Sequence, residues 1–463
     1  MTAILWYRRD LRLDEHPALH AALDAHDLVV PVYCLDDRLL HGRHRSGPRT
    51  QFLLECLRDL DAALRERGSG LLIRRGRPEQ QLLEISRELD ASEVHVTADP
   101  TPFARERDAR VQAALERDGI TLQSHPGLAV IDDVAAPQTG SGGPYKVFEP
   151  FHRSWLKEER RPLMGPPSEL PVLPAGLRRG RVPSLGSLGL EQRLADPPRG
   201  GAAAGRGRLE RFLSEGAERY ASERDRLAPG RTSRLSPYIH FGCVSPREIE
   251  TRLGRHHGHD AFRRQLAWRD SHHHVMSHFP QNAGTEFQAR FRGRVKWSRS
   301  KTRFQAWREG RTGYPLVDAG MRQMRREGWM HNRARLVVGS FLTKDLGIDW
   351  RWGERHFMEW LVDGDEANNN GNWQWIASVG TDPQPVARRI YNPTRQMASH
   401  DPDGRYVRRY VPELARVPDE YLREPWAMPR DIQQRAGCLI GEDYPEPIVD
   451  HLEARREALK RYR

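Results

Sequence analysis

The chain has 463 residues, of which 30% are charged, and its 74 lysines and arginines against 63 acidic residues give a formal net charge of +11. This length allows about two to four domains, no stretch approaches the roughly 20 apolar residues of a membrane span, and the N-terminus lacks the apolar run of a signal peptide. With four widely separated cysteines and no CxxC pair, the sequence excludes membrane, disulfide-rich secreted and disordered proteins and predicts a cytoplasmic protein.

The positive charge is compatible with a polyanionic partner such as nucleic acid, because neutralised phosphates release their counterions. Arginine-rich composition alone does not establish such a partner. A more specific feature is the bunching of tryptophan: nine of the 12 tryptophans fall between Trp268 and Trp375. This segment therefore needs an explanation beyond average composition.

The first 130 residues alternate strand-like and helix-like patterns, which predicts a doubly wound parallel α/β domain. Neither GxGxxG nor GxxxxGK[ST] is present, so the domain lacks the phosphate-binding loops of dinucleotide and P-loop proteins. The expected strands are Ala3–Tyr7, Leu28–Leu35, Leu71–Ile73, Val94–Thr97 and Ile120–Leu122, and the expected helices are Pro17–Ala25, Thr50–Arg67, Pro78–Leu89 and Arg105–Arg117.

Residues 131–207 are rich in Pro, Gly and Arg. They predict an interdomain connector that is partly disordered around 165–207 and carries one docked helix over Phe148–Lys157. Residues 208–463 read as a large all-α domain, since strand-like alternation largely disappears. The expected helices are 209–223, 246–255, 259–278, 301–309, 315–326, 331–345, 350–361 and 366–377.

Three dense polar segments stand out in this helical half: Thr232–Tyr238, Gly328–Arg335 and Asp363–Trp375. Hydroxyls beside a helix start can donate to a phosphate, and Asn332 and Arg335 share one helix face. Acids and amides as dense as those of the third segment are costly to bury unpaired, so they face water or hold a polar ligand. The tryptophans and isoleucine at its end indicate that the segment enters a core.

In this order and spacing, the three segments resemble those of the DNA photolyase/cryptochrome family, most closely class I cyclobutane pyrimidine dimer photolyases. The resemblance covers nearly the whole chain and includes Arg8–Arg12, Thr312–Ala319, Asn392-Pro393 and Val411–Leu414. The family implies an N-terminal α/β antenna-chromophore domain, a helical domain that binds FAD and the DNA lesion, and blue-light-driven splitting of pyrimidine dimers, a carbon–carbon lyase reaction.

The resemblance also implies the residues that bind FAD. It places Arg335 in a pair with Asp363, and it puts Asn369 opposite flavin N5, where an amide can both donate and accept a hydrogen bond. The whole implied set is Tyr220, Thr232, Ser233, Arg234, Leu235, Ser236, Arg335, Asp363, Gly364, Asp365 and Asn369.

Part of the tryptophan excess gains a role from the same resemblance. Trp373, Trp350 and Trp297 match an electron-hopping chain between flavin and solvent, and together with Asn369 they form the predicted catalytic set. Trp268 matches the aromatic ring that stacks on flipped-out bases. The implied DNA contacts are Arg224, Gln265, Trp268, Arg269, Asn332, Arg333 and Gln396.

Three positions depart from the family pattern. Gln265 stands where dimer-repairing members usually have Glu, Leu336 where they have Met, and Ser271 where an aromatic is usual. Glutamine can hydrogen-bond a thymine edge but carries no charge, whereas leucine conserves the volume of methionine. These changes bear on repair efficiency and leave the expected fold unchanged.

Arg49, Asp99 and His240 fall at antenna-contact positions. They favour 8-hydroxy-5-deazaflavin over methenyltetrahydrofolate, and an empty or flavin-filled site stays open. No metal site is expected, because in the histidine run of residues 272–274 with His278 only His274 and His278 share a helix face.

The sequence thus predicts a monomeric enzyme without an obligate protein partner, which repairs dimer-containing DNA by electron transfer from excited reduced FAD. The alternative is a cryptochrome-like blue-light receptor that uses the same FAD and tryptophans without efficient repair. A light-independent DNA-binding protein would leave the Asp363–Trp375 segment unexplained.

Overall fold

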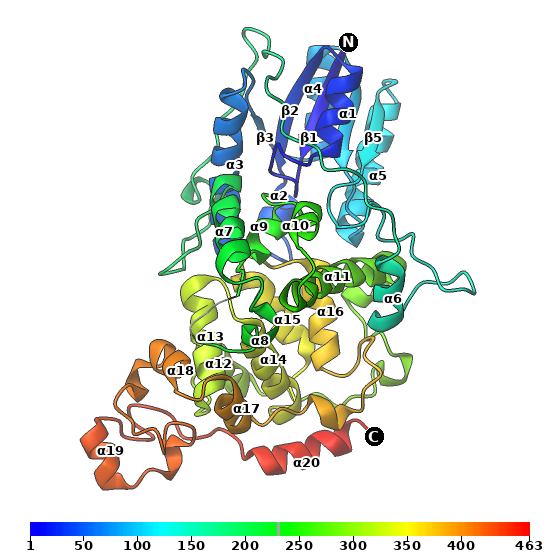
Figure 1. The fold of residues 1–463 in the computed structure, drawn as a ribbon. Helices are drawn as coiled ribbons and strands as arrows, with labels where there is room; N and C mark the ends of the chain where they lie inside the picture. The colour runs from blue at the N-terminus through cyan, green and yellow to red at the C-terminus, as the bar shows by residue number, and fades with distance from the viewer. Residues whose placement is uncertain (229–231) are drawn as a thin grey trace.

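Five parallel strands form a sheet at the N-terminal end of the protein, for which a computed structural model describes residues 1–228 and 232–463 (Figure 1). The strand order is β3-β2-β1-β4-β5, so the chain starts in the middle of the sheet and winds outward in both directions. The predicted doubly wound α/β domain is confirmed. The strands are β1 (Thr2–Tyr7), β2 (Leu28–Leu35), β3 (Leu72–Arg75), β4 (Ala91–Thr97) and β5 (Thr121–His125).

Helices cover both faces of the sheet, because alternate strand residues point to opposite sides. In β1, Leu5 and Tyr7 belong to one apolar core together with residues of α1 (Pro17–Ala25) and α3 (Gly47–Arg65). Ile4 and Trp6 belong to a second core with residues of α4 (Pro78–Leu89) and α5 (Pro102–Glu116). A short helix, α2 (Asp37–Leu40), follows β2.

The connector is fastened to both halves, which differs from the partial disorder expected around 165–207. Leu185, Leu188, Leu190 and Leu194 are buried in the core that contains α1 and α3. Backbone hydrogen bonds join Ile73 N to Arg179 O (2.7 Å) and Asp196 N to Arg326 O (2.9 Å). Because its leucines supply apolar surface to a core, this Pro- and Arg-rich segment packs although its helical structure is limited to α6 (Phe148–Trp155), one 3-10 turn (Gly186–Leu188) and the start of α7 (Ala202–Glu215).

The rest of the described chain is helical and lies against the lower edge of the sheet in Figure 1. Its Ser245 caps a helix as the sequence indicates, with Oγ accepting from Arg247 N at 3.1 Å. The helices are α7 (Ala202–Glu215), α8 (Tyr220–Glu223), α9 (Ser236–His240), α10 (Pro246–Arg252), α11 (His257–His278), α12 (Lys301–Glu309), α13 (Pro315–Glu327), α14 (Asn332–Ser340), a π-helical turn η4 (Phe341–Asp345), α15 (Trp350–Trp360), α16 (Glu366–Ile376), α17 (Pro393–His400), α18 (Arg405–Tyr410), α19 (Arg430–Ala436) and α20 (His451–Arg461).

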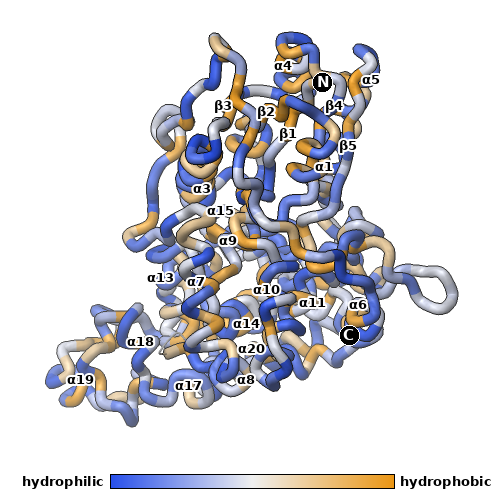
Figure 2. Tube along the Cα trace, turned by 45° about the horizontal axis from the view of Figure 1, so that its top comes forward, coloured by the Kyte–Doolittle hydropathy of each residue, from blue (hydrophilic) through white to orange (hydrophobic). Residues whose placement is uncertain are grey.

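Hydrophobic and hydrophilic residues are interspersed along the chain of this helical half (Figure 2). Among the described helices, none has the length and apolar character that a membrane crossing requires. All four cysteines are buried and free.

Candidate functional site

A cavity of about 520 Å³ opens in the helical half, within the size range of cofactor sites. Its wall is built from α8, α9, α11, α14, α16 and the loops that precede α9, α14 and α16. The structure brings most of the predicted FAD and DNA residues together here: Tyr220, Arg224, Thr232, Ser233, Arg234, Leu235, Ser236, Gln265, Trp268, Arg269, Asn332, Arg333, Arg335, Asp363 and Asp365.

The hydroxyl-rich segment before α9 is held in a strained conformation. Arg234 has a positive φ of 51°, and its guanidinium pairs with Glu327 Oε2 at 3.0 Å while it lies 4.3 Å from the centre of the Trp329 ring. Trp329 in turn donates through Nε1 to Ser236 Oγ at 3.2 Å. Thr232 Oγ1 is buried without a hydrogen-bond partner among the described residues, so this wall offers a free polar group to a ligand.

Arg335 and Asp363 form the ion pair that the sequence predicts. Arg335 Nη2 donates to Asp363 Oδ2 at 2.8 Å, and its Nε donates to the carbonyl of Met330 at 2.9 Å. The other carboxylate oxygen, Asp363 Oδ1, is buried without a partner in the described structure. Arg335 thus orients the carboxylate so that one oxygen stays free to accept a hydrogen bond.

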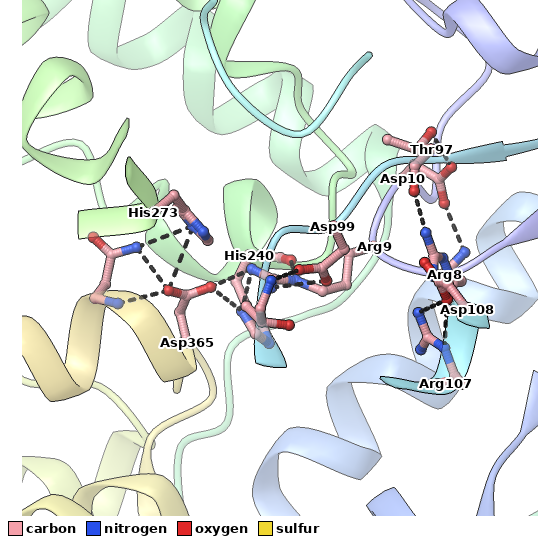
Figure 3. A network of polar contacts seen from close by, with 12 residues as sticks. Arg8, Arg9, Asp10, Thr97, Asp99, Arg107, Asp108, His240, His273 and Asp365 are labelled. Atoms are coloured by element: carbon pink, nitrogen blue, oxygen red, sulfur yellow. Dashed lines mark hydrogen bonds and ion pairs between the residues drawn. The ribbon is translucent and has the colours of Figure 1, made fainter. Parts of the chain in front are cut away.

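Asp365 joins the cavity to the N-terminal domain (Figure 3). Its Oδ1 caps α16 by accepting from Asn368 N at 2.8 Å, and Oδ2 pairs with Arg9, which follows β1. Burial alone would raise the pKa of Asp365, but the neighbouring His273, Arg9 and His240 hold it well below its usual range. The carboxylate is therefore ionised and fully used by the protein, which makes it a structural anchor of the cavity wall.

A second cavity, of about 360 Å³, lies between the sheet and the helical half and contains the three predicted antenna residues, Arg49, Asp99 and His240. His240 lines both cavities, and burial followed by the charge of Arg9 lowers its pKa to about 4. Arg9 contacts Asp99 Oδ2 at 3.4 Å and donates through Nε to His240 O at 3.1 Å. Arg9 therefore lies between the two cavities and touches residues of both.

Two of the implied cofactor residues and one DNA residue lie outside the large cavity. Asn369 and Gly364 line an adjoining cavity of about 90 Å³, which shares Asp363 with the large one. Asn369 Nδ2 donates to Glu354 O at 2.9 Å. Gln396 lies on α17 with a buried, unpartnered Oε1 among the described atoms, and it does not line the cavity.

Two of the three predicted electron-transfer tryptophans, Trp373 and Trp350, lie at α15, and Trp297 is next in sequence to a residue that bonds the turn before this helix. Trp373 packs on the backbone of Gly353, where an added Cβ would meet its ring at 2.2 Å, and Gly353 is one helical turn from the fully buried Trp350. Ser298 N donates to Gly347 O at 2.7 Å, which brings the neighbouring Trp297 beside the start of α15. Trp297 is only partly buried.

Trp268 lines the cavity, and one face of its ring is packed against a residue that the sequence does not reveal. Phe148, on α6 of the connector, stacks on the Trp268 ring with centroids 3.7 Å apart and planes 7° apart. The Arg264 guanidinium covers Phe148 in turn, 4.7 Å from its centroid. One face of Trp268 is therefore fixed by packing while the residue lines the cavity.

The histidine run of residues 272–274 in α11 is buried, and His278 is half-buried. His274 Nδ1 lies 2.8 Å from Val134 O and His278 Nε2 lies 3.0 Å from Ala135 O, so both side chains pack on the connector. His272 lines the cavity, and burial lowers its pKa to about 4. Sequence reasoning missed this cavity position, which its spacing of one turn from Trp268 could have indicated.

Comparison with known proteins agrees with this geometry. The family model described as the FAD binding domain of DNA photolyase matches residues 262–463, and the one described as DNA photolyase matches residues 3–171. The chain belongs to the DNA photolyase family. It is 41% identical over 459 residues to a deoxyribodipyrimidine photo-lyase of Streptomyces griseus, covering 98% of this chain and 97% of the relative.

Two solved structures of the family superpose on the chain. A bacterial class III photolyase from Agrobacterium tumefaciens has a TM-score of 0.93 at 34% identity and covers 100% of this chain and 97% of its own. A cryptochrome from Synechocystis has a TM-score of 0.92 at 29% identity, covering 99% and 98%. The predicted family and photo-lyase type of enzyme are confirmed, and the placement in class I stays a prediction.

Proposed function

We propose that the protein repairs cyclobutane pyrimidine dimers in DNA with light, using FAD bound in the large cavity. The observation that carries the proposal is the meeting of two sets of residues in one cavity: the free polar atoms of Thr232 and Asp363, and the supported ring of Trp268 beside Gln265. A cofactor and a flipped-out pyrimidine dimer can therefore lie next to each other.

The residues present fit FAD. Thr232 Oγ1 is an unpartnered donor for a phosphate oxygen, and Asp363 Oδ1 is an unpartnered acceptor for a sugar hydroxyl or a ring N–H. Tyr220, Ser233, Arg234, Leu235 and Ser236 would complete the phosphate side. When bound and reduced, FAD supplies the light-excited electron that enters the dimer and returns once both cyclobutane carbon–carbon bonds have broken.

The lesion side is built from α11 and α14. Trp268 presents a flat apolar ring on which an unpaired base can stack, and Gln265, one helical turn earlier, offers an amide to the edge of that base. Because this amide is neutral, it can orient the dimer but supplies no proton or charge. Asn332, at the start of α14, adds a second amide at the same cavity.

Basic side chains near the cavity would contact the DNA backbone. Arg224, Arg269 and Arg333 line the cavity, and Arg333 is oriented by Asp225 Oδ1 at 2.9 Å. We assign them to phosphate contacts, with Gln396 nearby on α17, so that binding falls steeply with salt.

We further propose that Trp373, Trp350 and Trp297 carry electrons between solvent and FAD during photoreduction. The packing of Trp373 on α15, the position of Trp350 at the start of that helix, and the increase in exposure from the buried Trp373 and Trp350 to Trp297 support this path. Asn369 would act from its neighbouring position in α16, where the hydrogen bond to Glu354 O fixes its amide.

The smaller cavity would hold an antenna chromophore, for which we favour 8-hydroxy-5-deazaflavin over methenyltetrahydrofolate. Among its described hydrogen bonds, the Arg49 guanidinium donates only to the backbone carbonyls of Met358, Leu361 and His44. No carboxylate accepts from it in these bonds, so its positive charge favours an anionic or carbonyl-rich pigment. Absorbance of the protein purified from a host that makes deazaflavin distinguishes this pigment from folate and from a second flavin.

The proposal also covers the cellular role: a cytoplasmic monomer that acts on damaged DNA without an obligate protein partner. The similarity to a Synechocystis cryptochrome and the neutral Gln265 favour one alternative, a blue-light receptor with weak repair.

Illumination of the reduced holoprotein with a dimer-containing single-stranded oligonucleotide tests the proposal. We expect thymine absorbance to return in the light only, and we expect Trp268→Ala to lose affinity for the damaged strand while it keeps FAD. The matched control Trp426→Ala, at a residue that does not line the cavity, should bind damaged DNA like the parent protein. No repair by FAD-loaded, reduced protein would refute the proposal and support the light receptor.

A further inference from the structure

Three histidines and one glutamate gather beneath helix α1, on the face of the sheet opposite α4 and α5. His26 ends α1, Glu93 and His95 lie on β4, and His125 ends β5. Residues 93 and 95 point to the same face because strand side chains alternate, and the intervening Val94 packs in the other core, with α4 and α5. None of the four residues lines the cavities described above.

The distances between three of these side chains match a metal site. His26 Nε2 lies 3.4 Å from Glu93 Oε2, and His95 Nε2 lies 3.0 Å from the same oxygen. One ligand atom from each of the three residues lies within 4.8 Å of the others. Ligand atoms placed about 2.1 Å from a tetrahedral zinc ion are roughly 3.4 Å apart, so one ion fits between them with little movement.

One of the two imidazole nitrogens that face Glu93 lacks a hydrogen bond among the described residues, whereas the other, His26 Nε2, is within hydrogen-bond distance of Glu93 Oε2 at 3.4 Å. The side chains of His26 and His95 are each 3% exposed. His95 Nε2 faces Glu93, yet its alignment makes no hydrogen bond, and it has no other partner among the described residues. A buried imidazole nitrogen that lacks a hydrogen bond costs free energy, and a bound cation would use its lone pair.

We propose that His26 Nε2, Glu93 Oε2 and His95 Nε2 bind one divalent transition-metal ion, preferentially zinc. Two imidazoles and one carboxylate are a donor set that zinc accepts, and water completes the tetrahedron through the side of Glu93, which is 29% exposed. The ion joins the C-terminal end of α1 to β4. This assignment replaces the expectation of no metal, which rested on the histidines of α11 alone.

His125 supports this arrangement from outside the ligand set. Its Nε2 lies 3.0 Å from His95 Nδ1, and the two rings stack with centroids 5.0 Å apart. When His95 binds the ion through Nε2, its Nδ1 carries the proton, and this N–H donates a hydrogen bond to His125 Nε2. Such an outer partner fixes the tautomer and the ring direction of a histidine ligand.

Zinc titration of the chelator-treated, FAD-loaded full-length protein tests the proposal. We expect one equivalent of Zn²⁺ to bind and to raise the thermal unfolding midpoint, whereas Mg²⁺ at the same concentration does neither. His95→Gln and Glu93→Gln should each abolish stoichiometric binding. His20→Gln is the matched control, since this histidine lies on α1 and contacts Gly165 O instead of the cluster.

His125→Gln should keep the stoichiometry and weaken zinc affinity by about tenfold or more. Bound FAD and the far-ultraviolet circular dichroism spectrum establish that each variant is folded. Absence of a stoichiometric zinc ion in the parent protein would overturn the proposal without the need for any variant. Retention of that ion by folded His95→Gln and Glu93→Gln proteins would overturn it as well, because the ion would then lie elsewhere.

Discussion

Arg9 is the side chain whose loss should disturb both cavities at once. Its guanidinium is 20% exposed and pairs with two buried carboxylates, Asp365 and Asp99, whose side chains are 7% and 11% exposed. Removal of one partner from a buried ion pair costs about 3–5 kcal/mol. Because Arg9→Gln keeps one amide donor and the site is partly hydrated, we expect a loss of about 2–3 kcal/mol in unfolding free energy.

Urea unfolding of the FAD-loaded protein, followed by circular dichroism, measures this loss. Arg75→Gln is the matched control: its pair with Asp37 has both side chains 48% exposed, so its removal should cost at most about 1 kcal/mol. Asp365→Asn keeps a capping residue for α16 and removes the charge that Arg9 neutralises. The double variant should therefore cost less than the sum of the single ones.

Strict additivity of Arg9→Gln and Asp365→Asn would refute this reasoning, because it would show that the two side chains do not stabilise each other. Equal losses of unfolding free energy for Arg9→Gln and Arg75→Gln would refute it as well. The functional counterpart is FAD affinity: Arg9→Gln should weaken it, since the Asp365 carboxylate then loses the cation that holds it at the cavity wall.

Other variants test separate parts of the account. Trp297→Phe should slow photoreduction of oxidised FAD and spare repair by chemically reduced protein, as flash absorption and repair assays would show; an unchanged photoreduction rate would exclude this path. Phe148→Ala should weaken binding of damaged strands by about twofold to tenfold, because the stack on Trp268 contributes about 0.5–1.5 kcal/mol; unchanged affinity in a titration would contradict that support. Burial and then Asp99 raise the pKa of Glu366 from 4.5 to about 7. The folded protein thus loses stability as pH rises through this interval. Glu366→Gln should therefore raise the free energy of unfolding by about 3 kcal/mol at pH 8 and leave it unchanged near pH 4. An equal rise at pH 4 and pH 8, measured by urea unfolding, would refute this.

Much of the α/β domain could be predicted from sequence because its strands are short apolar runs separated by amphipathic helices. Leu28–Leu35, Pro17–Ala25 and Pro78–Leu89 match the structure residue for residue. The helices α17–α19 escaped prediction, since they have six to eight residues and stand among prolines and glycines that mask their periodicity. The longer helix α20 was missed as well. The packing of the connector was missed for a related reason: its leucines are isolated in sequence and come together only in the folded core.

The site was predictable where the family resemblance covers a whole motif. Arg335 and Asp363 pair as expected, and the Thr232–Ser236 segment lies at the cavity. Contacts between distant segments left no such signal: Phe148 stacks on a residue 120 positions away, and Arg9 reaches Asp365 across the junction of the two halves.

The same limit applies to the cluster beneath α1. His26 and Glu93 are 67 residues apart in sequence, and neither belongs to a recognisable metal-binding motif. Only the parallel pairing of β1 with β2 and β4, together with the packing of α1 on the sheet, brings them into contact.

The most direct test of the central claim is the number of dimers split per reduced flavin under anaerobic blue light without added reductant. Because the electron returns after each repair, the account predicts many repaired dimers for each flavin, with the flavin still reduced at the end, and none in the dark. At most one dimer per flavin, with the flavin oxidised in step, would contradict the claim of repair without net redox change. No repair at all would show that the protein uses its light for another purpose.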